Sequence, residues 1–154
     1  MNKICLGFMT LILFLTGCGT GDEKTLTNAD SEQNERGDEI VAGEIVSSLI
    51  ETSPSVFQFV VKNQAEKEVT LEFTSSQRFD YSVNTLENEE IFLYSSVTSF
   101  LQVLGKETLK QGDDWTYDIN LKDLDLKPGK YRVTAWMTPK DGPAYKVTKE
   151  FIVK

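Results

Sequence analysis

The residues of this chain that could do chemistry are mostly carboxylates that stand in pairs beside predicted turns. A calcium site needs about six to eight oxygen ligands from a shaped loop, and no stretch here has the Asp-x-Asp-x-Asp-Gly spacing of such a loop. A glycosidase also uses two carboxylates, but on either side of a cleft that nothing in the sequence indicates. We therefore expect solvated turns, and no metal, at the three pairs: Glu89 and Glu90, Asp113 and Asp114, and Asp123 and Asp125.

Nucleophilic catalysis is also poorly supported. The chain has no histidine, so it lacks the commonest general base and a frequent metal ligand. Serines occur at four candidate positions, and no Ser-x-x-Lys motif accompanies them: Ser75, Ser76, Ser95 and Ser96. We expect a protein that is not an enzyme and has no cofactor. Its net charge of −8 also argues against nucleic acid as a partner, because binding to phosphates requires a basic surface.

The N-terminus combines an apolar run with a cysteine. The run from Ile4 to Leu15 is shorter than the about 20 residues that cross a bilayer, but it is typical of a signal peptide. It ends in Leu15-Thr16-Gly17-Cys18, which resembles the bacterial lipobox. The resemblance implies that residues 1–17 are a signal peptide that is removed. It also implies that Cys18 receives a diacylglyceryl thioether and that the new N-terminus is acylated.

This lipid predicts where the protein is located. Two or more acyl chains anchor a protein stably, at about 0.8 kcal/mol for each buried CH₂ group. We expect attachment to the cell membrane on its extracytoplasmic face. Residues 18–39 follow as the lipidated cysteine and an acidic tether, whose polar composition cannot form a core. As a flexible linker, the 21 residues after Cys18 would hold their ends roughly 25 Å apart.

Residues 40–154 have the pattern of one β domain. Short runs rich in β-branched and aromatic residues alternate with polar turns. Five residues, Asn63 to Lys67, are expected to join two of the runs as a hairpin, and only Val97–Leu104 has a helical pattern, as a short turn at best. About seven or eight strands predict an all-β, immunoglobulin-like antiparallel β-sandwich. The predicted strands are Val56–Val61, Val69–Phe73, Arg78–Asn84, Glu90–Ser95, Trp115–Ile119, Tyr131–Met137 and Tyr145–Val153.

Two residues are expected to fix corners of this sandwich. Tyr131 follows a Pro-Gly turn at the start of a strand, which is similar to a tyrosine corner, where the hydroxyl bonds back to the backbone. In the stretch Arg78–Val83, alternation directs Phe79, Tyr81 and Val83 toward the core and Arg78, Asp80 and Ser82 toward solvent, or the reverse if the strand lies at an edge. An exposed Arg78–Asp80 pair would contribute only about 0–1 kcal/mol. We favour Asp80 as an acceptor for backbone N–H groups near Ser95–Ser99, with a role in partner binding as the alternative.

Several segments together resemble the BsuPI family of intracellular proteinase inhibitors. They run in the family's order: Phe59–Asn63, Val69–Phe73, Ser75–Tyr81, Ile91–Ser95, Phe100–Leu104, Leu109–Gly112 and Pro128–Val133. The chain departs from the family at Ser76, where we expect a glycine, and at Leu93, where an aromatic residue or Arg is frequent. The resemblance implies a sandwich fold and an inhibitor of proteinases. The lipobox conflicts with an intracellular role, because an anchored domain outside the membrane cannot meet a cytoplasmic proteinase.

Two loops are candidates for recognition, around Phe100 and Leu101 and around Pro139 and Pro143. The first belongs to a long connection, residues 97–112, which could also plug one open end of the sandwich. The second is a proline-braced hairpin tip, and a rigid loop loses little entropy on binding. We expect a membrane-anchored, non-enzymatic protein-binding domain, with inhibition of a serine protease as the form that the resemblance implies. The alternative is an accessory module that binds another cell-envelope protein without inhibiting it.

Overall fold

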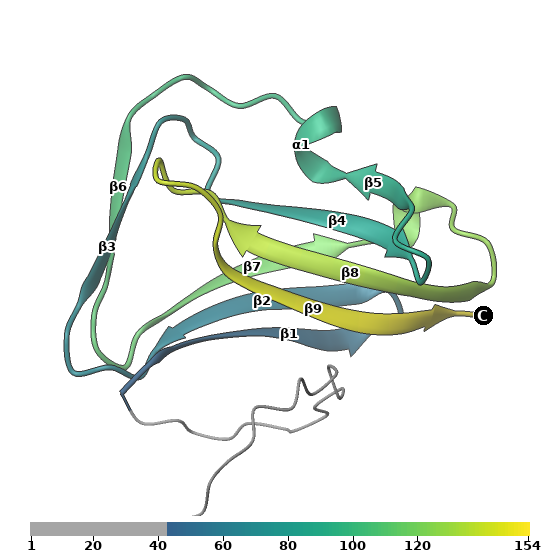
Figure 1. Cartoon of the computed structure of the whole chain (residues 1–154), viewed down its shortest axis with the longest axis horizontal. Coiled ribbons are helices and arrows are strands. Elements are labelled where there is room, and N and C mark those ends of the chain that lie inside the picture. Colours follow the sequence, from purple (N-terminus) through teal and green to yellow (C-terminus); the bar gives the residue numbers. More distant parts are fainter. Residues whose placement is uncertain (1–42) are drawn as a thin grey trace, which may run out of the picture. The chain divides into compact units, whose positions relative to one another are not determined.

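A computed structural model describes residues 43–154 of the chain. Within them the fold is all-β and antiparallel, as predicted, with nine strands rather than seven or eight (Figure 1). The predicted signal peptide, the lipidated Cys18 and the tether lie outside the described residues. The elements are β1 (Ile45–Ser53), β2 (Val56–Asn63), β3 (Val69–Phe73), β4 (Phe79–Thr85), β5 (Glu90–Leu93), α1 (Tyr94–Val97), β6 (Gly105–Leu109), β7 (Asp114–Asn120), η1 (Lys122–Leu124), β8 (Gly129–Met137) and β9 (Ala144–Val153).

The strands form two main sheets and one ribbon. One sheet has the order β1-β2-β7 and the other β5-β4-β8-β9, and all their pairings are antiparallel. Large apolar side chains from both sheets meet in one core, where the rings of Phe57 and Phe151 lie edge to face at 5.4 Å between centroids. The remaining strands, β3 and β6, pair only with each other among the described strands. Figure 1 shows this ribbon at a steep angle to the strands of the two sheets.

The connection between β2 and β3 is a corner, so the predicted hairpin is wrong. β2 pairs with β1 and β7, whereas β3 pairs with β6. Asn63, fully buried at the turn, donates from Nδ2 to the carbonyls of Lys67 and Leu109 and accepts at Oδ1 from the Ala65 N–H. A buried amide is stable only when its hydrogen bonds are made. Asn63 therefore turns the chain out of the sheet and into the ribbon.

Two further expectations about the elements need correction. The helical turn comes earlier than predicted, at Tyr94–Val97, and residues 98–104 are neither helix nor strand. Strands β1 and β6 were not predicted, since both carry a high share of polar residues. The tyrosine corner is confirmed, because the Tyr131 hydroxyl donates to the Lys127 carbonyl at 2.8 Å. It fixes the chain where it enters β8.

Candidate functional site

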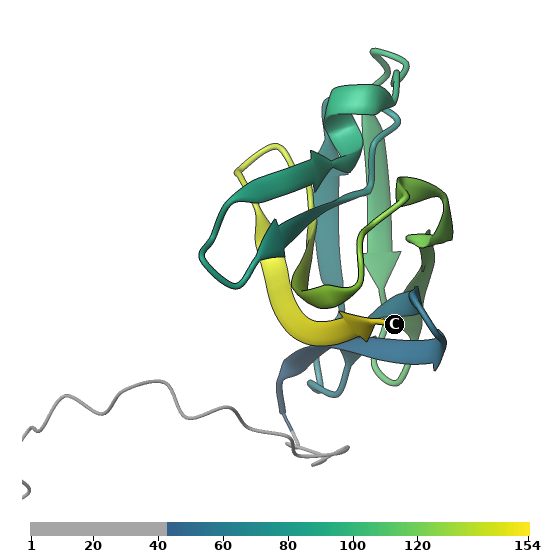
Figure 2. The same cartoon turned by 90° about the vertical axis from the view of Figure 1, so that its right-hand side faces the viewer.

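The end of the domain beside α1 brings three features together: a polar network on Arg78, an apolar stretch of chain, and the β8–β9 connection. We call residues 97–104 the apolar segment and residues 138–143 the proline loop. In Figures 1 and 2 the apolar segment leaves α1 at one extremity of the domain. The two loops that the sequence analysis named as candidates for recognition, around Phe100 and around Pro139, thus both lie at this end of the domain.

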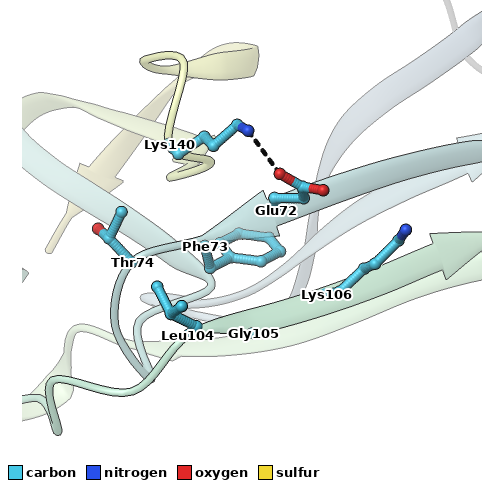
Figure 3. Close-up of a pocket in the computed structure, with 7 residues that line it drawn as sticks. All are labelled: Glu72, Phe73, Thr74, Leu104, Gly105, Lys106 and Lys140. Atoms are coloured by element: carbon cyan, nitrogen blue, oxygen red, sulfur yellow. Dashed lines mark hydrogen bonds and ion pairs between the residues drawn. The ribbon is translucent and has the colours of Figure 1, made fainter.

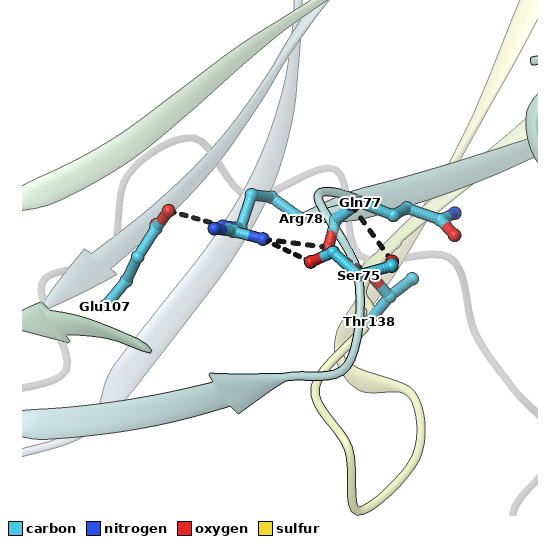
Figure 4. A network of polar contacts seen from close by, with 5 residues as sticks. All are labelled: Ser75, Gln77, Arg78, Glu107 and Thr138. Carbon is cyan, nitrogen blue, oxygen red and sulfur yellow. Dashed lines mark hydrogen bonds and ion pairs between the residues drawn. The ribbon is translucent and has the colours of Figure 1, made fainter. Parts of the chain in front are cut away.

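Arg78 is the centre of the polar network (Figure 4). Its Nε forms an ion pair with Glu107, and its Nη1 donates to the carbonyls of Ser75 at 2.8 Å and Gln77 at 3.4 Å. Its Cζ lies 4.5 Å from the centroid of the Phe73 ring, within the range of a cation–π interaction. Arg78 does not pair with Asp80 on an exposed strand face, because its guanidinium crosses to the β3–β6 ribbon instead.

Asp80 is buried and accepts backbone hydrogen bonds. Its Oδ1 receives the N–H of Tyr81 at 2.9 Å and that of Ser95 at 3.1 Å. The expectation that it bonds a turn near Ser95–Ser99 is confirmed, while the expectation that Asp80 and Ser82 face solvent is wrong. Asp80 thus fixes the residue next to the start of α1, and α1 leads into the apolar segment.

The aromatic side chains beside Asp80 form a stacked cluster. The Phe79 ring lies 4.6 Å from that of Tyr117, and the Tyr81 ring lies 5.0 Å from that of Tyr94. Burial, with smaller contributions from the nearby Tyr94 and Asp80, raises the pKa of Tyr81 to about 12. Burial likewise raises the pKa of Tyr117 to about 12, with a contribution from Glu107. These hydroxyls stay neutral at ordinary pH, which suits a structural role for the row.

The apolar segment exposes most of its large side chains. Val97 is 67% exposed, Leu101 71%, Val103 50% and Leu104 88%. The expectation that this connection plugs the end of the sandwich therefore fails for these four, and Phe100 alone packs inward, edge to face against Tyr94. No charged residue occurs between positions 91 and 105. The segment thus exposes four large apolar side chains within eight residues that carry no charge.

The backbone of the apolar segment is nevertheless fixed at its middle. The Ser76 N–H donates to the Leu101 carbonyl at 2.8 Å, and the Leu101 N–H donates to Ser76 Oγ at 2.9 Å. The Val103 N–H donates to the same Leu101 carbonyl at 3.0 Å. Ser76, which replaces an expected glycine of the family pattern, thus supplies the hydroxyl that holds this stretch.

The proline loop is held in a different way. The Lys140 N–H donates to the Glu72 carbonyl at 2.7 Å, the Lys140 ammonium pairs with the Glu72 carboxylate, and the Thr138 N–H donates to the Arg78 carbonyl. The ion pair lowers the pKa of Glu72 and raises that of Lys140. Pro139 is half-buried and Pro143 is exposed, but no large apolar side chain projects from this loop.

A groove runs along the ribbon where the Glu72–Lys140 pair joins it to the proline loop (Figure 3). One part, of about 330 Å³, has Phe73 and Leu104 among its walls; a second part, of about 550 Å³, lies against Pro139 and Pro143. Glu72, Lys106 and Lys140 border both parts. Open and mixed in polarity, the groove has no cluster of groups arranged for catalysis.

The other sequence candidates are scattered. The six paired carboxylates at Glu89, Glu90, Asp113, Asp114, Asp123 and Asp125 are all exposed. Within residues 43–154, no three His, Cys, Asp or Glu side chains gather as a metal site would require. No helix in that same range is long and apolar enough to cross a membrane.

Comparison with known families identifies the domain. The family model described as "BsuPI: Intracellular proteinase inhibitor" matches residues 45–142. The match covers well over half of the chain, from the first residue of β1 to the proline loop. The chain belongs to the BsuPI family. The apolar segment lies inside the BsuPI match, as does the proline loop except for Pro143, and the family description is that of an inhibitor rather than of an enzyme.

Other comparisons add little. No curated protein matches the chain. A solved structure of a calcium-binding mutant of Bacteroides uniformis beta-glucuronidase 2 is similar, at 14% identity and a TM-score of 0.32. The match covers 75% of this chain but 13% of that protein. So remote a likeness carries no argument about function, and the chain spans a small part of that protein's length.

Sequence reasoning missed Gly105, and it included Leu104 only as one of several apolar residues in the connection of residues 97–112. Leu104 is the most exposed large apolar residue in the described domain. A Cβ built on Gly105 would lie 2.5 Å from Nη2 of Arg78, so the guanidinium lies directly against the Gly105 backbone. The signal in the sequence was the uncharged stretch of residues 91–105. Such a stretch does not by itself distinguish a core strand from an exposed loop.

Proposed function

We propose that this protein is a lipid-anchored inhibitor of serine proteases on the extracytoplasmic face of the cell membrane. The observation that carries the proposal is the BsuPI family match over residues 45–142. Inhibition is the activity in the family's description. An inhibitor must present a shape to the enzyme without unfolding, and a sandwich with loops fixed by hydrogen bonds suits that task.

The surface of the domain supports binding to a protein. A patch of exposed apolar side chains usually marks an interaction site, and the apolar segment exposes four large ones within eight residues. Its backbone is anchored through Leu101, so less conformational entropy is lost when a partner binds. These features favour a preformed binding surface.

The inhibition assay uses the full chain, purified in a non-ionic detergent. It is titrated against a panel of extracellular subtilisin-like and chymotrypsin-like proteases while residual activity is followed. We expect stoichiometric inhibition at sub-micromolar concentration of at least one enzyme. Full residual activity throughout the panel, with the chain intact or simply digested, would refute inhibition.

The proposed anchor rests on Cys18 and its preceding Leu-Thr-Gly sequence. Lipid on this cysteine would place the domain outside the cytoplasm, so the proteases it meets would be exported enzymes.

The anchor is tested by growing cells that express the chain with radiolabelled palmitate. Label should be incorporated into the wild type and lost in Cys18→Ala. The matched control is Cys5→Ala, within the predicted signal peptide, which should keep the label because Cys5 is removed; label retained by Cys18→Ala would refute the anchor.

A second candidate is an accessory module that binds another envelope protein. It is favoured by the lipobox, since an exported chain does not meet the intracellular proteinases that the family description names. Crosslinking in cells would separate the two functions. A protease captured at the apolar segment supports inhibition, and a protein without proteolytic activity supports the accessory role.

A further inference from the structure

We infer that Leu104 is the residue this protein inserts into the specificity pocket of its target, and that the target is a serine protease whose pocket accepts a large apolar side chain. The inference rests on the proposed inhibitory function and names the segment and the class of enzyme. It selects one of the two loops that are candidates for recognition.

The exposure of Leu104 is the first argument. At 88% it exceeds that of every other large apolar residue in the described domain. Leaving such a side chain in water forgoes about 1.5–3 kcal/mol that its burial would contribute. No charged residue lies between positions 91 and 105, so an apolar pocket could close over this side chain without desolvating a charge of the segment.

The availability of the backbone is the second argument. Proteases bind a substrate-like segment by pairing with its backbone, as an added strand pairs with a sheet edge. Leu101 cannot form this backbone pairing with an enzyme, because its N–H and its carbonyl are both bonded to Ser76. Leu104 directly precedes β6, and no hydrogen bond among residues 43–154 engages its backbone outside the strands. Its backbone groups are therefore available to an enzyme.

The support behind Leu104 is the third argument. Gly105 follows it and pairs with Phe73 in the ribbon. The Arg78 guanidinium lies against Gly105 and is itself held by Glu107 and by the Ser75 carbonyl. The Ser76–Leu101 hydrogen bonds fix the segment on the other side. Leu104 thus stands between two anchored points, which lets it enter a pocket with little loss of entropy.

The proline loop lacks this combination. It is anchored to Glu72, but its residues are polar, small or proline, and none projects a large apolar side chain. A rigid loop without an anchoring side chain supplies complementarity rather than binding energy. The partner that fits the apolar segment is therefore an enzyme with a deep apolar pocket.

The test exchanges the side chain at position 104 and follows the change in specificity. Full-length wild type, Leu104→Lys and Leu104→Ala are assayed against a subtilisin-like protease that prefers apolar residues and against trypsin, which prefers Lys and Arg. The matched control is Ile152→Lys, because Ile152 is a 61% exposed apolar residue on β9. The unfolding midpoints of all variants are measured as well, to check that each exchange leaves the fold intact.

We expect Leu104→Ala and Leu104→Lys to weaken inhibition of the subtilisin-like enzyme by about 30-fold or more, as for a central anchor of an interface. Leu104→Lys should gain inhibition of trypsin, and Ile152→Lys should match the wild type. If the wild type inhibits and both Leu104 variants inhibit equally well, the inference is wrong and the proposed function stands. If the wild type inhibits no enzyme of the panel, the proposed function and the inference both fail.

Discussion

The apolar segment and the proline loop show how differently one scaffold can hold two connections. The apolar segment is fixed by neutral hydrogen bonds between Ser76 and Leu101 and exposes large apolar side chains. The proline loop is fixed by a backbone bond and an exposed ion pair to Glu72, and exposes mainly polar groups. Rigidity is common to both, so it cannot by itself identify a binding site. The difference lies in which loop offers a side chain that gains from burial.

The largest effect on stability is expected where Asp80 holds the approach to the apolar segment. Asp80→Ala leaves the buried N–H of Tyr81 and the N–H of Ser95 without their acceptor, at a cost of about 1–3 kcal/mol. The unfolding midpoint should fall by several degrees. Asp118→Ala is the control, because its exposed carboxylate accepts a hydrogen bond from the Gln58 side chain. Equal unfolding midpoints for the two variants would show that Asp80 does not stabilise the fold.

The second effect compares the two cations that support the loops. Arg78 makes several charge-assisted contacts and is 24% exposed, so Arg78→Ala should cost about 1–3 kcal/mol and weaken inhibition. Lys140 is about half exposed in its pair with Glu72, so Lys140→Ala should cost little, since solvent screens an exposed ion pair. Chemical denaturation and the inhibition assay measure both. If Lys140→Ala impairs inhibition more than Arg78→Ala, the proline loop, and not the apolar segment, is the part that binds the enzyme.

The third effect compares a glycine in each region. Gly105→Ala would push the Arg78 guanidinium away, because the new Cβ would lie 2.5 Å from Nη2. It should weaken inhibition, and much less so in the Arg78→Ala background, where nothing remains to displace. Gly142→Ala meets no atom within 4 Å but forces alanine to φ +109°, so it should cost about 1 kcal/mol without changing inhibition. Additive effects of Gly105→Ala and Arg78→Ala would refute their contact.

The smallest effect is a difference in response to acid. The lowered pKa of Glu72 means that its ion pair contributes above the ordinary value of 4.5 and is lost as pH falls through the lowered pKa. The proline loop should therefore loosen in acid, whereas the Ser76–Leu101 bonds contain no titratable group. Carboxyl NMR of Glu72 should show a titration midpoint that rises in Lys140→Ala. An unchanged midpoint would mean that the pair does not form in solution.

Local sequence patterns predicted much of the sandwich. Strands with strict alternation, such as Val69–Phe73 and the run from Tyr131 to Met137, lie where predicted. The tyrosine corner was predictable because its hydrogen bond spans four residues. The Asp80 acceptor was predictable because an acid within a strand, next to a turn, has backbone donors nearby.

Pairing between distant segments was not predictable in the same way. The corner at Asn63 depends on Leu109, and the contacts of Arg78 depend on Glu107, which lies 29 residues away. β6 was missed because Gly105–Leu109 contains only one large apolar residue. The exposure of Leu104 was missed together with β6, because without that strand the apolar residues at 100–104 could equally be assigned to the core.

Hydrogen–deuterium exchange of the full chain, alone and with the protease it inhibits, tests the central claim most directly. Protection should appear in residues 97–105, while the proline loop exchanges at the same rate in both samples. Protection of residues 138–143 with an unchanged apolar segment would contradict the account.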